Sequence, residues 1–318
     1  MKILVTGCTG YIGAALLKAL SRREEFYAVG AARQMSSTAE NDIFSVGEMD
    51  GNVDWTNALY KVDVVIHTAG IAHRLRGGVN DLQENYQRIN VEGTLNLAKQ
   101  AAKLGVKRLI YISSIGVSGV NTASGKSFCE LDKPHPHNQY SHSKLQAERG
   151  LLQISNLMGL EVVIIRPPLV YGYDAPGNFG LLMNALRSGW LLPLRSIKNK
   201  RSFIALDNLI DFILTCILHE AAANEIFLIS DGFDISTPDF IRAIAKEIGV
   251  TAKLIPFPVI FLKIGAKLLG RIDSYYGLFG SLQIDISKAN NLLGWTPPFT
   301  LNEGIRRAAG YMVLSDIS

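Results

Sequence analysis

The sequence predicts an α/β protein built on a doubly wound parallel sheet. In its first half, short and continuously apolar segments alternate with longer segments of helical periodicity. Strands that are apolar along their whole length are typical of a parallel sheet that helices cover on both faces. A glycine-rich turn also joins the first apolar segment to the first helical one, as in dinucleotide-binding sheets.

The elements follow one another in a regular order. The expected strands are Lys2–Thr6, Tyr27–Ala32, Val62–His67, Arg108–Ser113 and Glu161–Arg166. The expected helices between them are Tyr11–Ser21, Asn90–Leu104 and Ser143–Met158. Right-handed crossovers between parallel strands place a ligand at the carboxyl ends of the strands, so functional side chains are expected there.

The texture of the sequence changes after Arg166, because prolines and glycines crowd into residues 167–180. Such a stretch is typical of a loop-rich boundary. We therefore predict a dinucleotide-binding domain at residues 1–166 and a smaller α/β domain, mainly for substrate, at residues 167–318. A further strand at Glu225–Ser230 can return to the main sheet, so the boundary is not a clean cut.

Composition and charge narrow the class of protein. The 318-residue chain is 48% hydrophobic and 19% charged, which excludes a mainly disordered protein. Its net charge of +4 is spread along the sequence and forms no basic stripe of the kind that binds nucleic acid. The three cysteines have neither metal-ligand spacing nor a disulfide framework, which indicates a reducing compartment. Without a signal-peptide pattern, a soluble and cytoplasmic protein is expected.

The most apolar late stretch of the chain runs from residue 256 to 270 and contains Lys263 and Lys267. It is too short and too charged to span a bilayer. It could lie on a membrane or on a partner protein, but a helix that faces the core is the favoured prediction.

The glycine-rich turn has the sequence Thr6-Gly7-Cys8-Thr9-Gly10-Tyr11-Ile12-Gly13. A phosphate must approach backbone N–H groups at a helix N-terminus, and a Cβ atom would block that approach. The residues expected to line a dinucleotide pyrophosphate are therefore Gly7, Gly10, Tyr11, Ile12 and Gly13; a turn needed only for packing is the alternative.

The end of the second strand bears on the choice of cofactor. Many dinucleotide folds carry an acidic residue there to hold the ribose hydroxyls, whereas this chain has Arg33. A guanidinium can pair with a ribose 2′-phosphate, which favours NADP(H), with NAD(H) still possible. A solvated surface arginine is the alternative interpretation.

Tyr140 and Lys144 are four residues apart at the start of an expected helix, so their side chains share one face. A nearby ammonium favours a phenolate, which would let Tyr140 exchange a proton with a substrate oxygen. Ser113 and Ser114 end the strand that starts at Arg108, and a hydroxyl there could hydrogen-bond the same oxygen. These residues predict an acid–base site; a surface helix pair is the alternative.

Histidines gather near Tyr140, at His135, His137 and His142, and His67 ends an expected strand. The intervening prolines and the absence of neighbouring acidic or thiol ligands argue against a metal site, and none is expected. The three histidines are assigned to a loop that could contact the substrate, and His67 to a structural or cofactor-wall role.

Together these motifs resemble the extended short-chain dehydrogenase/reductase family, also described as the NAD-dependent epimerase/dehydratase family. The resemblance covers nearly the whole chain, and its motifs are TGCTGYIG at 6–13, HTAG at 67–70, NVEGTLN at 90–96, YISSIGVSG at 111–119, YSHSK at 140–144, IRPPLVYG at 165–172, RSFIALDNLID at 201–211 and SKANNLLGWTPP at 287–298. It implies a Rossmann fold, a nucleotide-sugar substrate that is usually UDP-linked, and a homodimer formed by the helices near 90–104 and 143–158.

Position by position, the resemblance also implies roles for residues. Ser114 would bond the substrate oxygen, Tyr140 would be the acid and base, and Lys144 would hold the cofactor ribose.

The binding positions carried over by the resemblance are more scattered. Glu48 or Met49 would flank the adenine, and Ala69 would lie beside the cofactor. Asn178 and Arg201 match positions that contact the nucleotide diphosphate of the substrate.

The favoured function is an NADP(H)-dependent reduction at C4 of a nucleotide-linked sugar in surface polysaccharide biosynthesis. The segment from Leu269 to Asp285 looks closest to bacterial UDP-4-keto-6-deoxy-N-acetylglucosamine 4-reductases. The alternative is a UDP-glucose or UDP-N-acetylglucosamine 4-epimerase with tightly bound NAD. A dehydratase is disfavoured because Ile115 and Gly116 stand where such enzymes place an Asp–Glu pair. A non-catalytic cofactor-sensing protein is the remote alternative.

Overall fold

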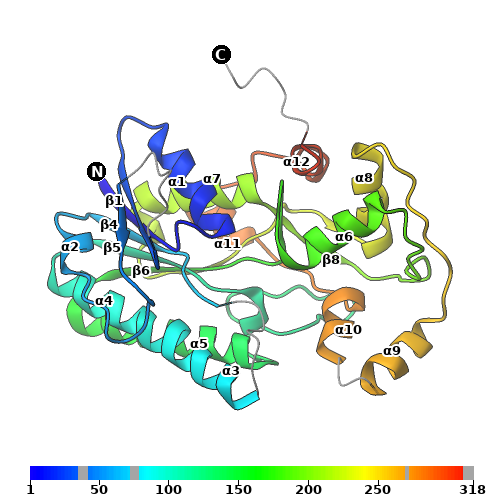
Figure 1. The fold of residues 1–318 in the computed structure, drawn as a ribbon, viewed down its shortest axis with the longest axis horizontal. Coiled ribbons are helices and arrows are strands. Elements are labelled where there is room, and N and C mark those ends of the chain that lie inside the picture. Colours follow the sequence, from blue (N-terminus) through cyan, green and yellow to red (C-terminus); the bar gives the residue numbers. More distant parts are fainter. Residues whose placement is uncertain (35–41, 72–78, 269–271, 311–318) are drawn as a thin grey trace.

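The computed structural model describes residues 1–34, 42–71, 79–268 and 272–310, and within them seven parallel strands form the central sheet in the order β10-β6-β5-β4-β1-β2-β3 (Figure 1). The strands are β1 (Lys2–Thr6), β2 (Tyr27–Ala32), β3 (Ile43–Ser45), β4 (Val64–His67), β5 (Arg108–Ile112), β6 (Glu161–Arg166) and β10 (Ile226–Leu228). The chain winds outward in both directions from β1 and β4. In open α/β sheets, the crevice at such a switch point holds the ligand.

Helices cover both faces of the sheet because its strands are buried along their length. One face carries α1 (Tyr11–Ser21), α7 (Leu206–Leu218) and α11 (Ser287–Leu293). The other carries α2 (Thr56–Leu59), α4 (Thr94–Lys103) and α5 (Gln139–Met158). Along β1, Ile3 and Val5 join the first core and Leu4 joins the second, as the alternation of side chains along a strand requires.

Shorter helices connect these layers. Helix α3 (Val79–Asn85) continues into a π-helical stretch, η1 (Tyr86–Gly93), which leads directly into α4. Single 3₁₀ turns follow β5 at η2 (Ile115–Val117) and α7 at η3 (Glu220–Ala222).

A further core lies beyond the carboxyl ends of the strands. It is formed by α6 (Gly177–Arg187), α8 (Thr237–Glu247) and α12 (Leu301–Ala308), where Phe203 stacks on Phe240 with 4.1 Å between ring centroids. Two small ladders border it, β7 (Val170–Tyr171) with β9 (Ile204–Ala205) and β8 (Arg201–Ser202) with β11 (Asp234–Ile235). Helices α9 (Val259–Leu268) and α10 (Ile272–Phe279) lie outside this core, away from the sheet (Figure 1).

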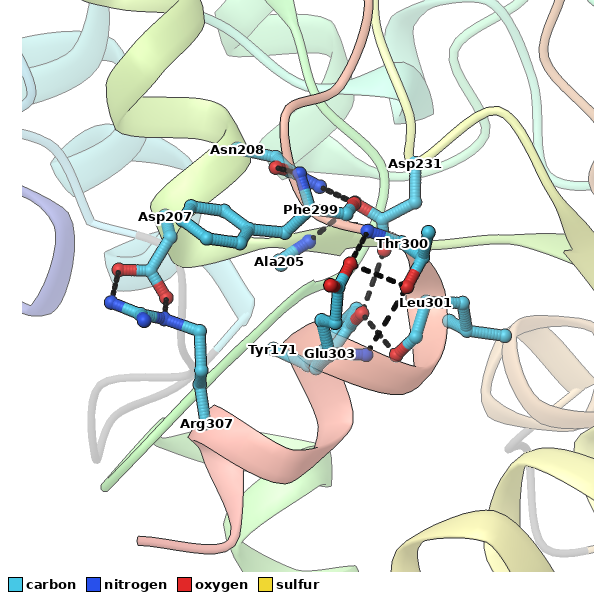
Figure 2. Close-up of polar contacts among 10 residues, drawn as sticks. All are labelled: Tyr171, Ala205, Asp207, Asn208, Asp231, Phe299, Thr300, Leu301, Glu303 and Arg307. Atoms are coloured by element: carbon cyan, nitrogen blue, oxygen red, sulfur yellow. Dashed lines mark hydrogen bonds and ion pairs between the residues drawn. The ribbon is translucent and has the colours of Figure 1, made fainter. Parts of the chain in front are cut away.

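A polar network joins this further core to α7 (Figure 2). The buried Asp231 carboxylate accepts hydrogen bonds from the Tyr171 hydroxyl at 2.7 Å, the Ala205 N–H at 2.9 Å and the Asn208 amide at 2.7 Å. Asn208 also exchanges two hydrogen bonds with the backbone of Phe299. The side chains that follow β9 are thereby tied to the segment that leads into α12.

The fold class predicted from the sequence is confirmed, and β1, α1, β2 and β6 have the expected bounds. Helix α5 begins at Gln139 rather than Ser143, because the Asn138 side chain caps it by accepting the Ser141 N–H at 2.8 Å. The helix expected from Asn90 is α-helical only from Thr94, since the preceding residues form the π-helix.

The prediction of a core-facing helix near residues 256–270 is wrong. On α9, Ile260 is 58% exposed, Phe261 59% and Ile264 47%. The segment is apolar, as the sequence shows, but it does not enter the further core because α6, α8 and α12 already fill that core. Among the described residues, no helix is long and apolar enough to cross a membrane.

Candidate active site

A cavity of about 190 Å³ opens at the carboxyl ends of β4, β5 and β6. It is lined by Ile12, Thr68, Gly70, Ile112, Ser113, Ser114, Tyr140, Lys144, Pro167, Pro168 and Val170. The structure therefore brings the expected serine, tyrosine and lysine together beside the start of α1. This is the position that the switch-point rule assigns to a ligand.

The glycine-rich turn between β1 and α1 packs closely against its own backbone and against the residues that follow β4. Gly7 has a φ of +70°, and a Cβ atom there would lie 2.7 Å from the Ala69 nitrogen. A Cβ atom on Gly13 would lie 2.3 Å from the Gly7 carbonyl oxygen. No side chain among the described residues caps the N-terminus of α1 at Tyr11, so its first N–H groups can receive an anion.

These features fit the dinucleotide that the sequence predicts. The Tyr11 ring itself turns away from the turn, since its hydroxyl lies near Gly172 and Leu206. The contribution of Tyr11 and Ile12 to a phosphate site is then the backbone N–H of the first helical turn, which does not depend on their side chains.

Helix α5 positions the acid–base candidates. Tyr140 and Lys144 are one turn apart on it, and both line the cavity together with Ser114. The Lys144 ammonium donates to the Ile112 carbonyl oxygen at 2.9 Å and lies 4.6 Å from the centre of the Tyr111 ring. Ser114 also accepts the Gly116 N–H at 3.1 Å, which fixes its hydroxyl at the end of β5.

Burial dominates the electrostatics of this pair. Loss of water raises the pKa of Tyr140 to about 12, with a further increase from Tyr86 and an opposing effect of the Ser114 hydrogen bond. Loss of water also lowers the pKa of Lys144 to about 8, and the Glu148 carboxylate opposes this decrease. At neutral pH the phenol is therefore protonated and Lys144 is mostly charged. The residues alone set Tyr140 as a proton donor.

Behind Lys144, a buried ion pair connects α5 to β6. The Arg166 guanidinium donates to both carboxylate oxygens of Glu148, at 3.0 and 2.6 Å, and both side chains are at most 3% exposed. Ser113 donates to the same carboxylate at 2.5 Å. The pair fixes the helix that carries Tyr140 and Lys144 against the strand ends.

Replacing Arg166 with leucine is expected to lower the free energy of unfolding by about 3 to 5 kcal/mol, because Glu148 would remain buried without a countercharge. Urea denaturation at neutral pH measures this loss. The matched control is Arg242→Leu, which removes an exposed ion pair with Asp239 and should change stability by less than about 1 kcal/mol. Equal losses in the two variants would contradict the prediction.

The buried His67 is one of two polar residues next to the cavity. His67 lies between the hydroxyls of Thr6 and Thr94, at 2.6 and 2.9 Å, and burial followed by the Lys144 charge lowers its pKa to about 3. A neutral imidazole held on both sides acts as a structural residue. This agrees with the role expected from the sequence.

Asn90 is a residue that sequence reasoning missed. Its amide donates to the Ser143 hydroxyl at 3.0 Å and the Ile71 carbonyl at 3.1 Å, and its oxygen accepts the Ile71 N–H at 2.8 Å. A Cβ atom on Gly70 would lie within 3.4 Å of both Asn90 and Lys144. Asn90 lies on the π-helix η1, and π-helical turns are frequent at functional sites. The motif NVEGTLN at 90–96, which begins with Asn90, was the available signal.

Other expected binding residues lie outside the 190 Å³ cavity. Arg33 is exposed at the end of β2, Met49 is buried in the α4 and α5 core, and Ala69 touches the Gly7 position. Glu48 forms an ion pair with Arg88 at 2.7 Å. Glu48, Met49 and Arg33 remain candidates for the adenosine end of a dinucleotide.

The expected substrate residues lie in the further core region. Asn178 is exposed in the first turn of α6. Arg201 is buried on β8 and donates to the Gly280 carbonyl oxygen at 2.8 Å, and loss of water lowers its pKa to about 10. In the described part of the chain, no group of three or more histidine, cysteine or acidic side chains is placed to hold a metal ion.

Comparison with known proteins places these features in context. The model of the NAD dependent epimerase/dehydratase family matches residues 3–230. A UDP-glucose 4-epimerase of Vibrio cholerae is 40% identical over 308 residues, which cover 96% of this chain and 94% of that protein. An N-acetyl-alpha-D-glucosaminyl-diphospho-ditrans,octacis-undecaprenol 4-epimerase of Escherichia coli O157:H7 is 26% identical over 97% of this chain and 94% of its own.

Solved structures share the fold at lower identity. A UDP-glucuronic acid 4-epimerase from Bacillus cereus, in complex with UDP-glucuronic acid and NAD, superimposes with a TM-score of 0.80 at 22% identity and full coverage of both chains. A UDP-N-acetylglucosamine 4-epimerase from the same organism gives a TM-score of 0.77 at 19% identity, covering 98% of this chain and 99% of the other. The likeness extends over the sheet and the further core.

Proposed function

Because the chain belongs to the NAD dependent epimerase/dehydratase family, we propose that it is a 4-epimerase of a UDP-linked hexose that works with a tightly bound nicotinamide dinucleotide. The observation that carries the proposal is the grouping of Ser114, Tyr140 and Lys144 around one cavity beside the glycine-rich turn. The relative from Vibrio cholerae, which is 40% identical and bears the name UDP-glucose 4-epimerase, supports the substrate class.

The roles of the residues follow from their positions. Ser114 hydrogen-bonds the oxygen at C4 of the sugar, and Tyr140 gives a proton to that oxygen or takes one from it. Lys144 holds the ribose of the cofactor and supplies positive charge beside the phenol. When bound, the cofactor would supply oxidation and reduction at C4 of the sugar. Proton exchange then requires no metal ligand from the chain.

For the cofactor we propose NAD(H) and keep NADP(H) as the alternative. Arg33 at the end of β2 favours a 2′-phosphate, but the structurally similar UDP-glucuronic acid 4-epimerase from Bacillus cereus holds NAD, which supports NAD(H) here. We also propose that two copies pair through α4 and α5, which lie side by side on one face of the sheet.

A second function is supported by the absence of an acidic residue at the end of β2: reduction of a UDP-4-keto-6-deoxy-N-acetylhexosamine by NADPH during surface polysaccharide biosynthesis. The two activities make opposite demands on the cofactor. An epimerase returns to C4 the hydride that it removes, so it needs no added reductant. A reductase consumes one equivalent of reduced cofactor for each product molecule.

One pair of assays tests the choice. Purified protein is incubated with UDP-glucose and no added cofactor, and UDP-galactose is measured by chromatography; the denatured protein is analysed for released NAD and NADP. Conversion with stoichiometric NAD is the expected result. Consumption of NADPH with the 4-keto sugar, without conversion of UDP-glucose, would establish the reductase instead. Bound cofactor with neither activity would leave a binding protein.

A further inference from the structure

Exposed apolar side chains gather on one outer face of the molecule, around α9. Ile260, Phe261 and Ile264 are 58%, 59% and 47% exposed, and Leu268 is 83% exposed. Their spacing along the chain puts them on one side of the helix. Solvated single apolar residues are ordinary, but a contiguous group of this kind marks an interaction surface.

A second segment extends the same face. Backbone hydrogen bonds join residues 192–195 to residues 253–255, including Leu192 N–H to Lys253 O at 2.9 Å and Ile255 N–H to Leu192 O at 3.0 Å. Immediately before this contact, Trp190 and Leu191 are 66% and 64% exposed. We call the surface formed by residues 190–198 and 253–268 the outer face; in Figure 1 it lies at the end of the molecule far from α4 and α5.

The charge of the outer face has one sign. Arg195, Lys198, Lys253 and Lys267 are all exposed on it. The sequence contains no acidic residue between Asp174 and Asp207, and none between Glu247 and Asp273. Over the whole chain, by contrast, 32 basic residues are nearly balanced by 28 acidic ones. The outer face therefore combines exposed aromatic and aliphatic side chains with uncompensated positive charge.

We propose that the outer face docks on a membrane surface that contains anionic phospholipids. Helices that bind at such an interface present aromatic and aliphatic side chains on one side and lysine or arginine beside them, and each basic residue near an anionic surface adds to binding. Tryptophan prefers this boundary because its ring is apolar and its N–H is polar. A second copy of the chain fits the face less well, since a symmetric interface would bring like charges together.

Docking through the outer face would fix the position of α6 and β8 relative to the bilayer. The outer face is continuous with α6 and β8, because residues 188–200 connect those two elements. Asn178 and Arg201, the expected contacts of the substrate diphosphate, belong to α6 and β8 themselves. A docked molecule would hold this part of the chain close to the bilayer, whatever sugar the active site accepts.

Vesicle sedimentation tests the proposal. The full chain should sediment with vesicles of phosphatidylcholine and phosphatidylglycerol, remain in solution with phosphatidylcholine alone, and be released from the anionic vesicles as salt is raised. The double variant Phe261→Glu, Ile264→Glu should bind anionic vesicles at least about 10-fold more weakly, since it removes two inserting side chains and adds negative charge. The double variant Lys253→Glu, Lys267→Glu should also weaken binding and reduce its dependence on salt.

The matched control is the double variant Leu131→Glu, Leu218→Glu, which adds the same two charges at leucines that are 96% and 56% exposed and lie outside the outer face, α4 and α5. It should bind vesicles like the parent chain. All variants should keep the parent unfolding transition and the parent activity on soluble substrate, so a failure of docking is separable from a failure of the proposed function. Absence of binding to anionic vesicles, or binding that the α9 variant does not weaken, would overturn the proposal. A change from dimer to monomer in that variant, without vesicle binding, would assign the face to a subunit contact instead.

Discussion

A Tyr140→Phe variant is expected to lose about 100- to 10,000-fold in kcat, which is the range that a positioned acid or base contributes. The change removes one oxygen from a half-buried ring and should leave the packing of α5 unchanged. The Ser114 hydroxyl still accepts the Gly116 N–H in the variant. Binding of the cofactor should be nearly unaffected, because the glycine-rich turn and Lys144 are intact.

Two measurements check this expectation: the rate of sugar turnover, and the amount of cofactor released when the protein is denatured. Tyr86→Phe is the matched control, since it removes a neighbouring phenol whose ring centre is 6.1 Å from that of Tyr140. That variant should keep most of the activity. If Tyr140→Phe retained the parent rate, another group would have to exchange the proton, and the proposed mechanism would be wrong.

Lys144→Met is expected to have opposite effects on activity and stability. Turnover should fall by about 100-fold or more, because the charge beside Tyr140 and the contact with the cofactor ribose are both lost. The free energy of unfolding at about pH 7 should instead rise by about 1 to 2 kcal/mol, since a buried ammonium costs more than its hydrogen bond to Ile112 returns. This is the opposition between function and stability found at many active sites.

The pH dependence fixes the sign of the stability effect. Burial lowers the pKa of Lys144 to about 8 in the folded chain, against about 10.4 in the unfolded chain. Between these values the unfolded state holds a proton that the folded state has lost, so the stability of the parent protein gains from rising pH in this window. The methionine variant lacks this gain, and its advantage should shrink toward about pH 10.

Urea unfolding at both pH values gives the comparison. Lys18→Met, at an exposed lysine on α1, should show the parent pH dependence and serves as the control. A Lys144→Met variant that is less stable than the parent at neutral pH would mean that the ammonium is favourably solvated inside the fold.

Much of the candidate site could be predicted because its signals are local in sequence. The glycine spacing at Gly7 and Gly13 and the four-residue step from Tyr140 to Lys144 carry their geometry with them. The ion pair of Glu148 with Arg166 was not foreseen. Only the packing of α5 against β6 brings these two charges together, and the sequence alone gives no sign of their burial.

The prediction for α9 failed for the opposite reason. Its apolar residues are a real signal, but composition alone does not tell whether an apolar side of a helix meets a core. That depends on how much of the neighbouring core other elements have already filled, which here are α6, α8 and α12. The exposure of the Phe261 side chain therefore depends on the tertiary packing and not on the sequence of α9 itself.

The return of β10 to the edge of the sheet has a consequence for the newly made chain. Strand β6 pairs on its outer side only with β10, whose residues follow some way along the sequence. During synthesis, β6 has left the ribosome while its partner is still being made, so the apolar sequence Val162–Ile165 presents an open strand edge for that interval. Such an edge can pair with another chain. The chain is therefore at risk of aggregation while the residues between β6 and β10 are being synthesised. Any truncation before residue 226 would make that risk permanent.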